Sequence, residues 1–143
     1  MPRTAVERVF DVGVPPDEAW RRLTDVERWP EWAPHITSVT VSPPGPLTPA
    51  SSGTLRVRYF GSSTFRMTAW EPPLRWEWTG GVPGMRIIYD HRFTPHGDPD
   101  STTLTWTVSL DGPLAVVARP VFARVYGGNV DRAIPRLQEW IRT

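Results

Sequence analysis

The sequence predicts an α+β fold in which an antiparallel sheet of about seven strands curves around one long C-terminal helix. Three observations predict it. Short segments that alternate apolar and polar residues, separated by turn-forming residues, recur from about residue 4 to residue 110 of the 143-residue chain. Two short helical segments follow the first of these strands. After Asp111-Gly112 the apolar residues recur at helical spacing. Because the chain is too short for two well-packed cores, we expect a single domain over residues 1–143.

The first strand is expected at about Thr4–Val14, and its apolar face also carries Arg8. Pro15-Pro16 ends the strand and suits the first turn of a short helix. Asp25 is expected to cap a second short helix, which the prolines that follow keep brief.

The middle of the chain is expected to form six further strands. They are Ile36–Ser42, Gly53–Phe60, Ser63–Glu71, Leu74–Thr79, Met85–Thr94 and Thr102–Leu110. Turn-forming pairs such as Gly61-Ser62 and Pro72-Pro73 separate them. Because short connections join antiparallel neighbours, these strands are expected to form one antiparallel sheet.

The C-terminal helix is expected over residues 113–142. Its apolar positions are Leu114, Val117, Val121, Val125, Val130, Ile134, Leu137 and Ile141. A helix of this length is about 45 Å long at ~1.5 Å per residue, so it can cross the sheet and close its concave face. Pro120, Gly127-Gly128 and Pro135 interrupt the pattern, and we expect a bend or break near the glycine pair.

Several motifs then resemble one superfamily. They are VPPDEAW at residues 14–20, DVERWPEWAP at residues 25–34, WEPPLRW at residues 70–76 and the hairpin that ends in STTLTW at residues 101–106. Together with the order of elements, they resemble the START-like (SRPBCC) superfamily and its bacterial polyketide cyclase/dehydrase-like branch over nearly the whole chain. The resemblance implies a helix-grip fold, which commonly encloses a cavity. Members of the branch include aromatases/cyclases and carriers of lipids or hormones.

The composition excludes several kinds of chemistry. All 16 basic residues are arginine, so lysine Schiff bases and phosphate-loop lysines are excluded. The absence of cysteine excludes thiolate catalysis, disulfides and cysteine-ligated zinc. The three histidines share no ligand spacing, and we expect neither a metal nor a cofactor.

Charge and hydropathy limit the partners that the protein is expected to bind and its expected location in the cell. The dispersed arginines and the net charge of +1 argue against a nucleic-acid binder. The longest wholly apolar run, Leu114–Ala118, is too short for a membrane span. The N-terminus has no apolar secretory stretch, so a cytoplasmic location is expected.

Strand alternation places mainly apolar and aromatic residues on the concave face. The ligand-binding candidates are Tyr59, Phe65, Met67, Trp76, Trp78, Ile87, Tyr89, His91, Phe93 and Trp106 from the strands, with Val121 and Val125 from the helix. Such a set is typical of a small-molecule cavity, but it equally describes a filled core. The resemblance favours a cavity. Of the eight tryptophans, Trp76, Trp78 and Trp106 are assigned to it.

The catalytic candidates are His91, Tyr89 and Arg8. A neutral imidazole and a phenol can move protons on an enolisable ketone, but a core histidine that bonds a neighbouring group explains His91 equally well. Arg8 can hold a carboxylate or an enolate oxygen, or it can extend to the rim with no chemical role.

Three functions therefore stay open. The leading hypothesis is a non-enzymatic binder of a hydrophobic, aromatic or polyketide-like small molecule in a cavity between the sheet and the C-terminal helix. The second is an aromatase/cyclase that catalyses aldol cyclisation and dehydration of a poly-β-keto chain. The third is a protein-interaction module of the chaperone-activator type, which requires a filled core and an exposed apolar patch.

Overall fold

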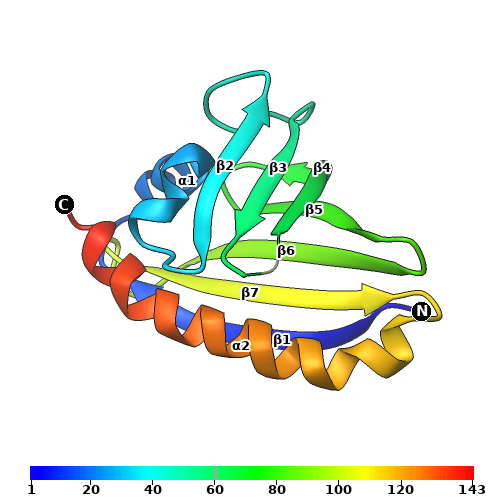
Figure 1. Ribbon diagram of the computed structural model, residues 1–143. Coiled ribbons are helices and arrows are strands. Elements are labelled where there is room, and N and C mark those ends of the chain that lie inside the picture. The colour runs from blue at the N-terminus through cyan, green and yellow to red at the C-terminus, as the bar shows by residue number, and fades with distance from the viewer. Residues whose placement is uncertain (60) are drawn as a thin grey trace.

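The computed structural model describes residues 1–59 and 61–143 (Figure 1). In chain order its elements are β1 (Arg3–Val12), α1 (Pro16–Leu23), the 3-10 helix η1 (Val26–Glu31), β2 (Ile36–Ser42), β3 (Ser52–Val57), β4 (Gly61–Glu71), β5 (Arg75–Val82), β6 (Met85–Pro95), β7 (Thr102–Asp111) and α2 (Ala115–Trp140). The strands form one antiparallel sheet in the order β1-β7-β6-β5-β4-β3-β2. The predicted α+β architecture is confirmed.

Some strand ends differ from the prediction because pairing and turns move them. β3 ends at Val57, and Tyr59 has a positive φ of 70°, so the chain has left the strand before the predicted end. Phe60, the last residue of that predicted strand, lies outside the described residues. β5 continues to Val82 because Val82 pairs with Met85 across the hairpin to β6.

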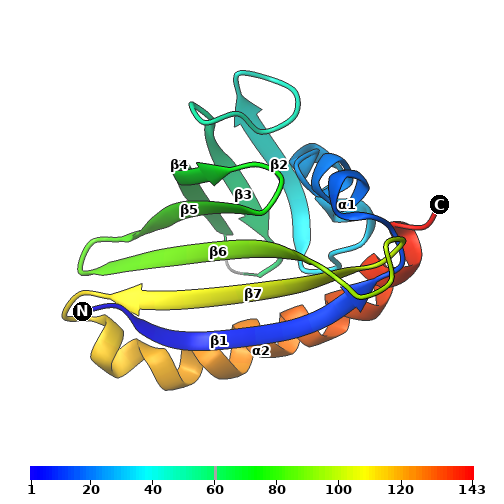
Figure 2. The same cartoon turned by 180° about the vertical axis from the view of Figure 1, so that it is seen from behind.

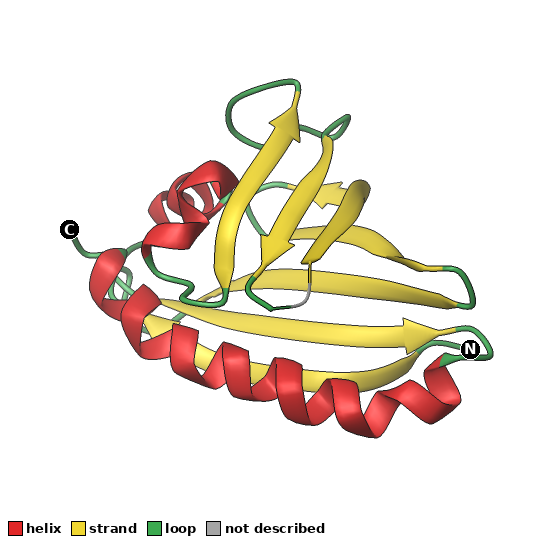
Figure 3. Cartoon of the chain, viewed as in Figure 1, coloured by secondary structure: helices red, strands yellow, loops and turns green. Residues whose placement is uncertain are grey.

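The helices lie on one side of the curved sheet and at one of its ends (Figure 3). α2 runs along β1 and β7, while α1 and η1 cover the end beside β2 (Figure 1). Seen from behind, none of the described helices lies in front of the middle of the sheet (Figure 2). No helix in the described ranges has the length and apolar character that a membrane crossing needs.

Of the bend or break expected in the long helix, a break is wrong. α2 runs without interruption through Pro120, Gly127-Gly128 and Pro135, from Ala115 to Trp140. Gly127 serves close packing instead, because a Cβ at this position would lie 3.0 Å from Nη2 of Arg8 on β1 and 3.9 Å from Cγ2 of Val6. Glycine here lets the helix approach the edge of the sheet.

The core divides into two clusters of buried apolar side chains. The larger one lies beneath α1, η1 and the C-terminal half of α2, and it includes Trp76, Phe93, Leu104 and Leu137. Trp20 of α1 closes it with edge-to-face contacts to Trp70, Trp76 and Phe93, at centroid distances of 5.2–5.4 Å. The smaller one joins the first half of α2 to β1, β6 and β7 and includes Val6, Ile87, Val108, Leu110 and Ala115.

The predicted apolar stripe of the helix is buried only in its C-terminal half. Val130, Leu137 and Ile141 are buried, whereas Val117, Val121 and Val125 are exposed to different extents. The reason is that Val117, Val121 and Val125 line a hollow in the concave face, while Ala115, Phe122 and Tyr126 make the contacts of this half of α2 with the sheet.

Candidate functional site

A cavity of about 760 Å³ lies between the first half of α2 and the inner faces of β3, β4, β5 and β6. Its apolar wall includes Leu55, Val57, Trp78, Ile87 and Phe122. Strand alternation explains this wall, because Ile87, Tyr89 and His91 are alternate residues of β6 and face the same side. The concave face is therefore not filled by the protein's own side chains.

The outer rim of the cavity is apolar on the helical side. Val121 and Val125 line the cavity while they are 67% and 39% exposed, respectively, so they lie where it opens to solvent. The strand side of the rim is made of Gly61–Thr64 at the start of β4 and of Val82 at the β5–β6 hairpin. A hydrophobic molecule can enter through this opening.

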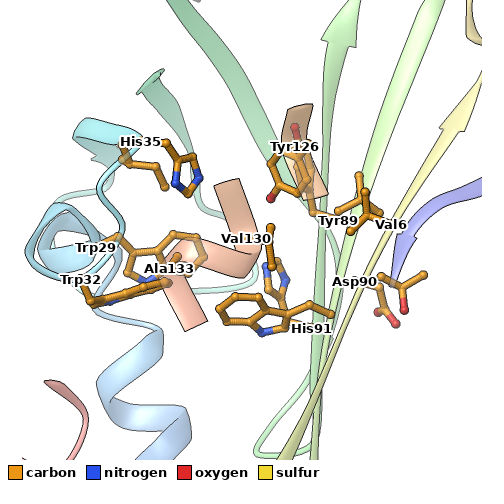
Figure 4. A pocket seen from close by; sticks show the side chains of 14 residues that line it. Val6, Trp29, Trp32, His35, Tyr89, Asp90, His91, Tyr126, Val130 and Ala133 are labelled. Carbon is orange, nitrogen blue, oxygen red and sulfur yellow. The ribbon is translucent and has the colours of Figure 1, made fainter. Parts of the chain in front are cut away.

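Four polar aromatic side chains gather at the inner end of the cavity. They are His35, from the segment before β2, Tyr89 and His91, from β6, and Tyr126, from α2 (Figure 4). The same four residues line an adjoining space of about 30 Å³, here named the inner chamber. Trp29 and Trp32 also line this chamber (Figure 4), as does Trp106. The polar aromatic side chains thus gather at the deep end of a largely apolar hollow, while Ser62, Ser63 and Thr64 line its rim.

His91 is enclosed by tryptophans. Its ring stacks on Trp76 at a centroid distance of 4.4 Å and meets the edge of Trp78 at 5.2 Å. The side chain is only 6% exposed, and burial lowers the pKa of His91 to about 4. Burial, with the nearby charge of Arg132, likewise lowers the pKa of His35 to about 4. Both imidazoles are neutral at physiological pH.

The two phenols of the site are uncharged as well. Burial raises the pKa of both Tyr89 and Tyr126, so their phenols keep their protons. None of the described residues that line the main cavity is an aspartate, glutamate or arginine. In the described part of the chain, moreover, no group of three His, Asp or Glu side chains is placed to hold a metal ion.

Seven of the predicted site residues lie at the site. Trp78, Ile87, Tyr89, His91, Val121 and Val125 line the cavity, and Trp106 lines the inner chamber.

Four predicted ligand-binding residues lie in the core instead. They are Phe65, Met67, Trp76 and Phe93. Phe65 pairs with Gly53 on one neighbouring strand and Gly80 on the other, and its ring covers Trp78 at a centroid distance of 4.3 Å. Strand alternation gave the correct face for these residues, but α1 and η1 cover that part of the concave face.

Tyr59 and Arg8 lie outside the cavity. Tyr59 is 92% exposed, because the chain turns after Val57 and the strand alternation that predicted its direction no longer applies. The guanidinium of Arg8 forms an ion pair with Asp131 of α2, with 2.6 Å between Nε and Oδ1 and 3.2 Å between Nη2 and Oδ2. Arg8 therefore joins β1 to α2. Of the two alternatives for this residue, a place inside the cavity is wrong, and a position outside it agrees with the alternative that has no chemical role.

Several lining residues were not predicted. Trp29 lies in η1, outside the strands whose alternation predicts the concave face, and His35 lies in a connection that has no periodic pattern. The spacing of Phe122 and Tyr126 could have identified them, because aromatic residues four positions apart lie on one face of a helix. Their rings stack at a centroid distance of 5.2 Å on the face of α2 that lines the cavity.

Comparison with known proteins identifies related sequences. The family described as polyketide cyclase / dehydrase and lipid transport matches residues 3–140. Uncharacterized proteins of Mycobacterium tuberculosis and Mycobacterium bovis are 27% identical over 114 residues, which are 77% of this chain and 66% of theirs. The chain thus spans just under two thirds of the length of these curated relatives.

Solved structures share the fold. The Zhui aromatase/cyclase of a Streptomyces species matches with a TM-score of 0.79 and 18% identity over 99% of this chain and 94% of its own. A START superfamily protein of Mycobacterium smegmatis matches with a TM-score of 0.76 and 16% identity over 96% of both chains. At these identities the likeness concerns the fold, and the predicted helix-grip fold is confirmed.

Proposed function

Because the chain belongs to the polyketide cyclase/dehydrase and lipid transport family of START-like proteins, we propose that it binds a hydrophobic, aromatic or polyketide-like small molecule without transforming it. The observation that carries the proposal is the cavity of about 760 Å³, open at one side and lined mainly by apolar side chains. Cavities of roughly 300–1,000 Å³ with such walls are typical of small-molecule sites.

Burial of the ligand supplies the driving force. A ligand that buries about 300 Å² of apolar surface gains about 7 kcal/mol before the costs of association are subtracted. Trp78, Ile87 and Phe122 offer flat or branched apolar surfaces for this contact, and the polar groups at the inner end fix the orientation. Affinity is therefore expected to follow the apolar area of the ligand.

An aromatase/cyclase is the second candidate function. The observation that favours it is that Tyr89 and His91 both line the inner chamber. However, an imidazole whose pKa lies at about 4 is a weak general base near neutral pH, and Arg8 is paired with Asp131 outside the cavity. Loss of turnover of a poly-β-keto substrate in both Tyr89→Phe and His91→Phe, with unchanged folding, would favour the enzyme.

The interaction-module hypothesis is less well supported. It requires a filled core, and the cavity argues against that. The exposure of Val117, Val121 and Val125 is explained by their place along the cavity, whereas the exposed Val116 lies outside it. The cytoplasmic location remains a prediction.

Titration with the neutral hydrophobic dye Nile red tests the proposed function. We expect one saturable site per chain, with an increase in dye emission as the dye leaves water. Val125→Trp, which places a bulky ring at the cavity wall, is expected to weaken binding by about tenfold or more. Val116→Trp is the matched control, because Val116 is an exposed valine of the same helix outside the cavity wall.

Two outcomes would contradict the proposal. One is the absence of saturable binding by a folded protein, as judged from its circular dichroism. The other is an equal effect of Val125→Trp and Val116→Trp, because binding would then not involve the cavity.

A further inference from the structure

The inner end of the cavity offers hydrogen bonds that the protein itself does not use. The Nδ1 atoms of His35 and His91 are buried and have no hydrogen-bond partner among the described residues. Two indole Nε1 atoms are also buried without a hydrogen-bond partner among the described residues. They belong to Trp32, which lines the inner chamber, and to Trp78, which lines the cavity. Because buried polar groups in proteins are nearly always paired, such a cluster indicates a place for a hydrogen-bonding atom of a ligand.

The available groups include both donors and acceptors. An indole N–H only donates, a phenol donates or accepts, and a neutral imidazole has one nitrogen of each kind. The inner chamber has a volume of about 30 Å³, close to the share of one water molecule in the liquid. Its size and its partners therefore suit one oxygen atom at the end of a ligand.

None of the described residues that line this end of the cavity is an arginine. Asp90 is the only ionisable carboxylate or guanidinium residue among the described lining residues of the inner chamber. Its carboxylate lies on the outer face of the sheet, where it accepts from Nε of Arg75 at 2.6 Å and from Nε of Arg92 at 2.8 Å. Arg132 lowers the pKa of His35 through its charge, but it is exposed and donates to Oδ1 of Asn129 at 2.6 Å.

We propose that the inner chamber binds an uncharged oxygen of the ligand, a ketone or aldehyde carbonyl or a hydroxyl group, and that the protein selects such neutral ligands over carboxylates. The inference rests on the proposed binding function and names the ligand class. A carboxylate that enters this site loses its water, and the described lining residues offer no buried cation to replace it. A carbonyl or hydroxyl oxygen needs only neutral hydrogen-bonding partners, which are present at Tyr89, His91 and Tyr126.

Three probes that share one ring system test the inference: naphthalene, 2-naphthol and 2-naphthoate, titrated by calorimetry at about pH 7.5, where the phenol is neutral and the carboxylate is ionised. We expect 2-naphthol to bind about fivefold to tenfold more tightly than naphthalene, as one net hydrogen bond allows. We expect 2-naphthoate to bind at least ~100-fold more weakly than 2-naphthol.

Two variants test whether the preference for 2-naphthol over naphthalene arises at the inner end of the cavity. Tyr126→Phe removes one hydroxyl from the site, and His91→Phe removes both imidazole nitrogens. Each is expected to reduce the preference for 2-naphthol over naphthalene by several-fold, while naphthalene itself still binds. Tyr126→Phe keeps the ring in place, so the test holds even where His91→Phe fails to fold. Tyr59→Phe is the matched control, because this tyrosine is exposed and outside the cavity.

Different failures separate the two proposals. Binding of naphthalene with no preference for 2-naphthol, or 2-naphthoate that binds as tightly as 2-naphthol, would overturn this inference and leave the proposed function intact. A preference unchanged in both variants would also overturn it, because the selecting group would then lie elsewhere. If neither the naphthalene series nor Nile red binds, the proposed function fails and this inference fails with it.

Discussion

The imidazole of His91 stacks on the indole of Trp76, with ring centroids 4.4 Å apart and an angle of 21° between the planes. Trp76 is completely buried in the larger core cluster, whereas His91 also lines the cavity and the inner chamber. This pair joins the packed part of the concave face to the hollow part. The protonation state of His91 therefore bears on both stability and binding.

The first prediction concerns the pH dependence of stability. Burial lowers the pKa of His91 to about 4, below its ordinary value of 6.5, so the unfolded chain takes up a proton at higher pH than the folded chain. Stability is unaffected by this group above about pH 6.5 and falls as the pH drops from there to about 4, by about 3 kcal/mol at most. His35 acts in the same direction.

Urea unfolding at several pH values measures this effect. Carboxylates whose pKa is lowered by hydrogen bonds and ion pairs, such as Asp131, lose their contribution only at lower pH, so the two windows can be separated. His91→Phe is expected to reduce the slope of stability against pH between about 6.5 and 4. An unchanged slope in this variant would show that His91 is not buried as a neutral group.

The second prediction assigns Arg8 a structural role. Arg8→Gln breaks the ion pair with Asp131 and is expected to cost no more than about 1 kcal/mol of stability, because both side chains are partly exposed. Nile red affinity is expected to change by less than about twofold. Asp131→Asn should have the same effects. If Arg8→Gln lost Nile red binding and Asp131→Asn did not, the structural role would be contradicted and Arg8 would have to contact the ligand.

The third prediction compares the two adjacent glycines of α2. Alanine in a helix is favoured over glycine by about 1 kcal/mol, so Gly128→Ala is expected to stabilise, since the nearest atom to its added Cβ is Nη1 of Arg132 at 3.6 Å. Gly127→Ala should gain less stability than Gly128→Ala, because the guanidinium of Arg8 has to move away from the added Cβ. Thermal unfolding of both variants checks this order, and a larger gain at Gly127 would contradict the close packing of α2 on β1.

The fourth prediction concerns Gly53 in β3. A Cβ at this position would overlap the carbonyl oxygen of Thr40 and the ring of Phe65. Gly53→Ala is therefore expected to destabilise the protein by about 1–3 kcal/mol. Gly97→Ala, where an added Cβ meets nothing within 4 Å, is the control and should be close to neutral. Equal stabilities of the two variants in urea unfolding would contradict the register of β3 with β4.

The strands could be predicted because their signal is local. The alternation of Ile87, Tyr89, His91 and Phe93 identified one face of β6 correctly, and the turn residues identified the connections. The same alternation did not distinguish Phe93, which is in the core, from Ile87, which lines the cavity. That distinction depends on which helix covers each part of the face, and alternation carries no information about it.

The continuity of the long helix and the positions of the loop residues were harder to predict, because they too depend on tertiary packing. Gly127-Gly128 indicated a break, but close packing against Arg8 and Val6 explains the first glycine within an unbroken helix. Tyr59 was assigned inward because the end of β3 has no strong signal in the sequence. His35 joins the site through tertiary packing alone, so no spacing in the chain could have identified it.

An NMR titration with 2-naphthol tests the central claim most directly, because the side-chain N–H signals of the eight tryptophans sample the cavity, the core and the surface. Trp29 and Trp78 line the cavity, whereas Trp20, Trp70 and Trp140 do not. We expect the signals of Trp29 and Trp78 to shift in a saturable way with one common dissociation constant, while the other three stay in place. Shifts confined to Trp20, Trp70 and Trp140, or no saturable shift of any indole signal, would contradict ligand binding in the cavity.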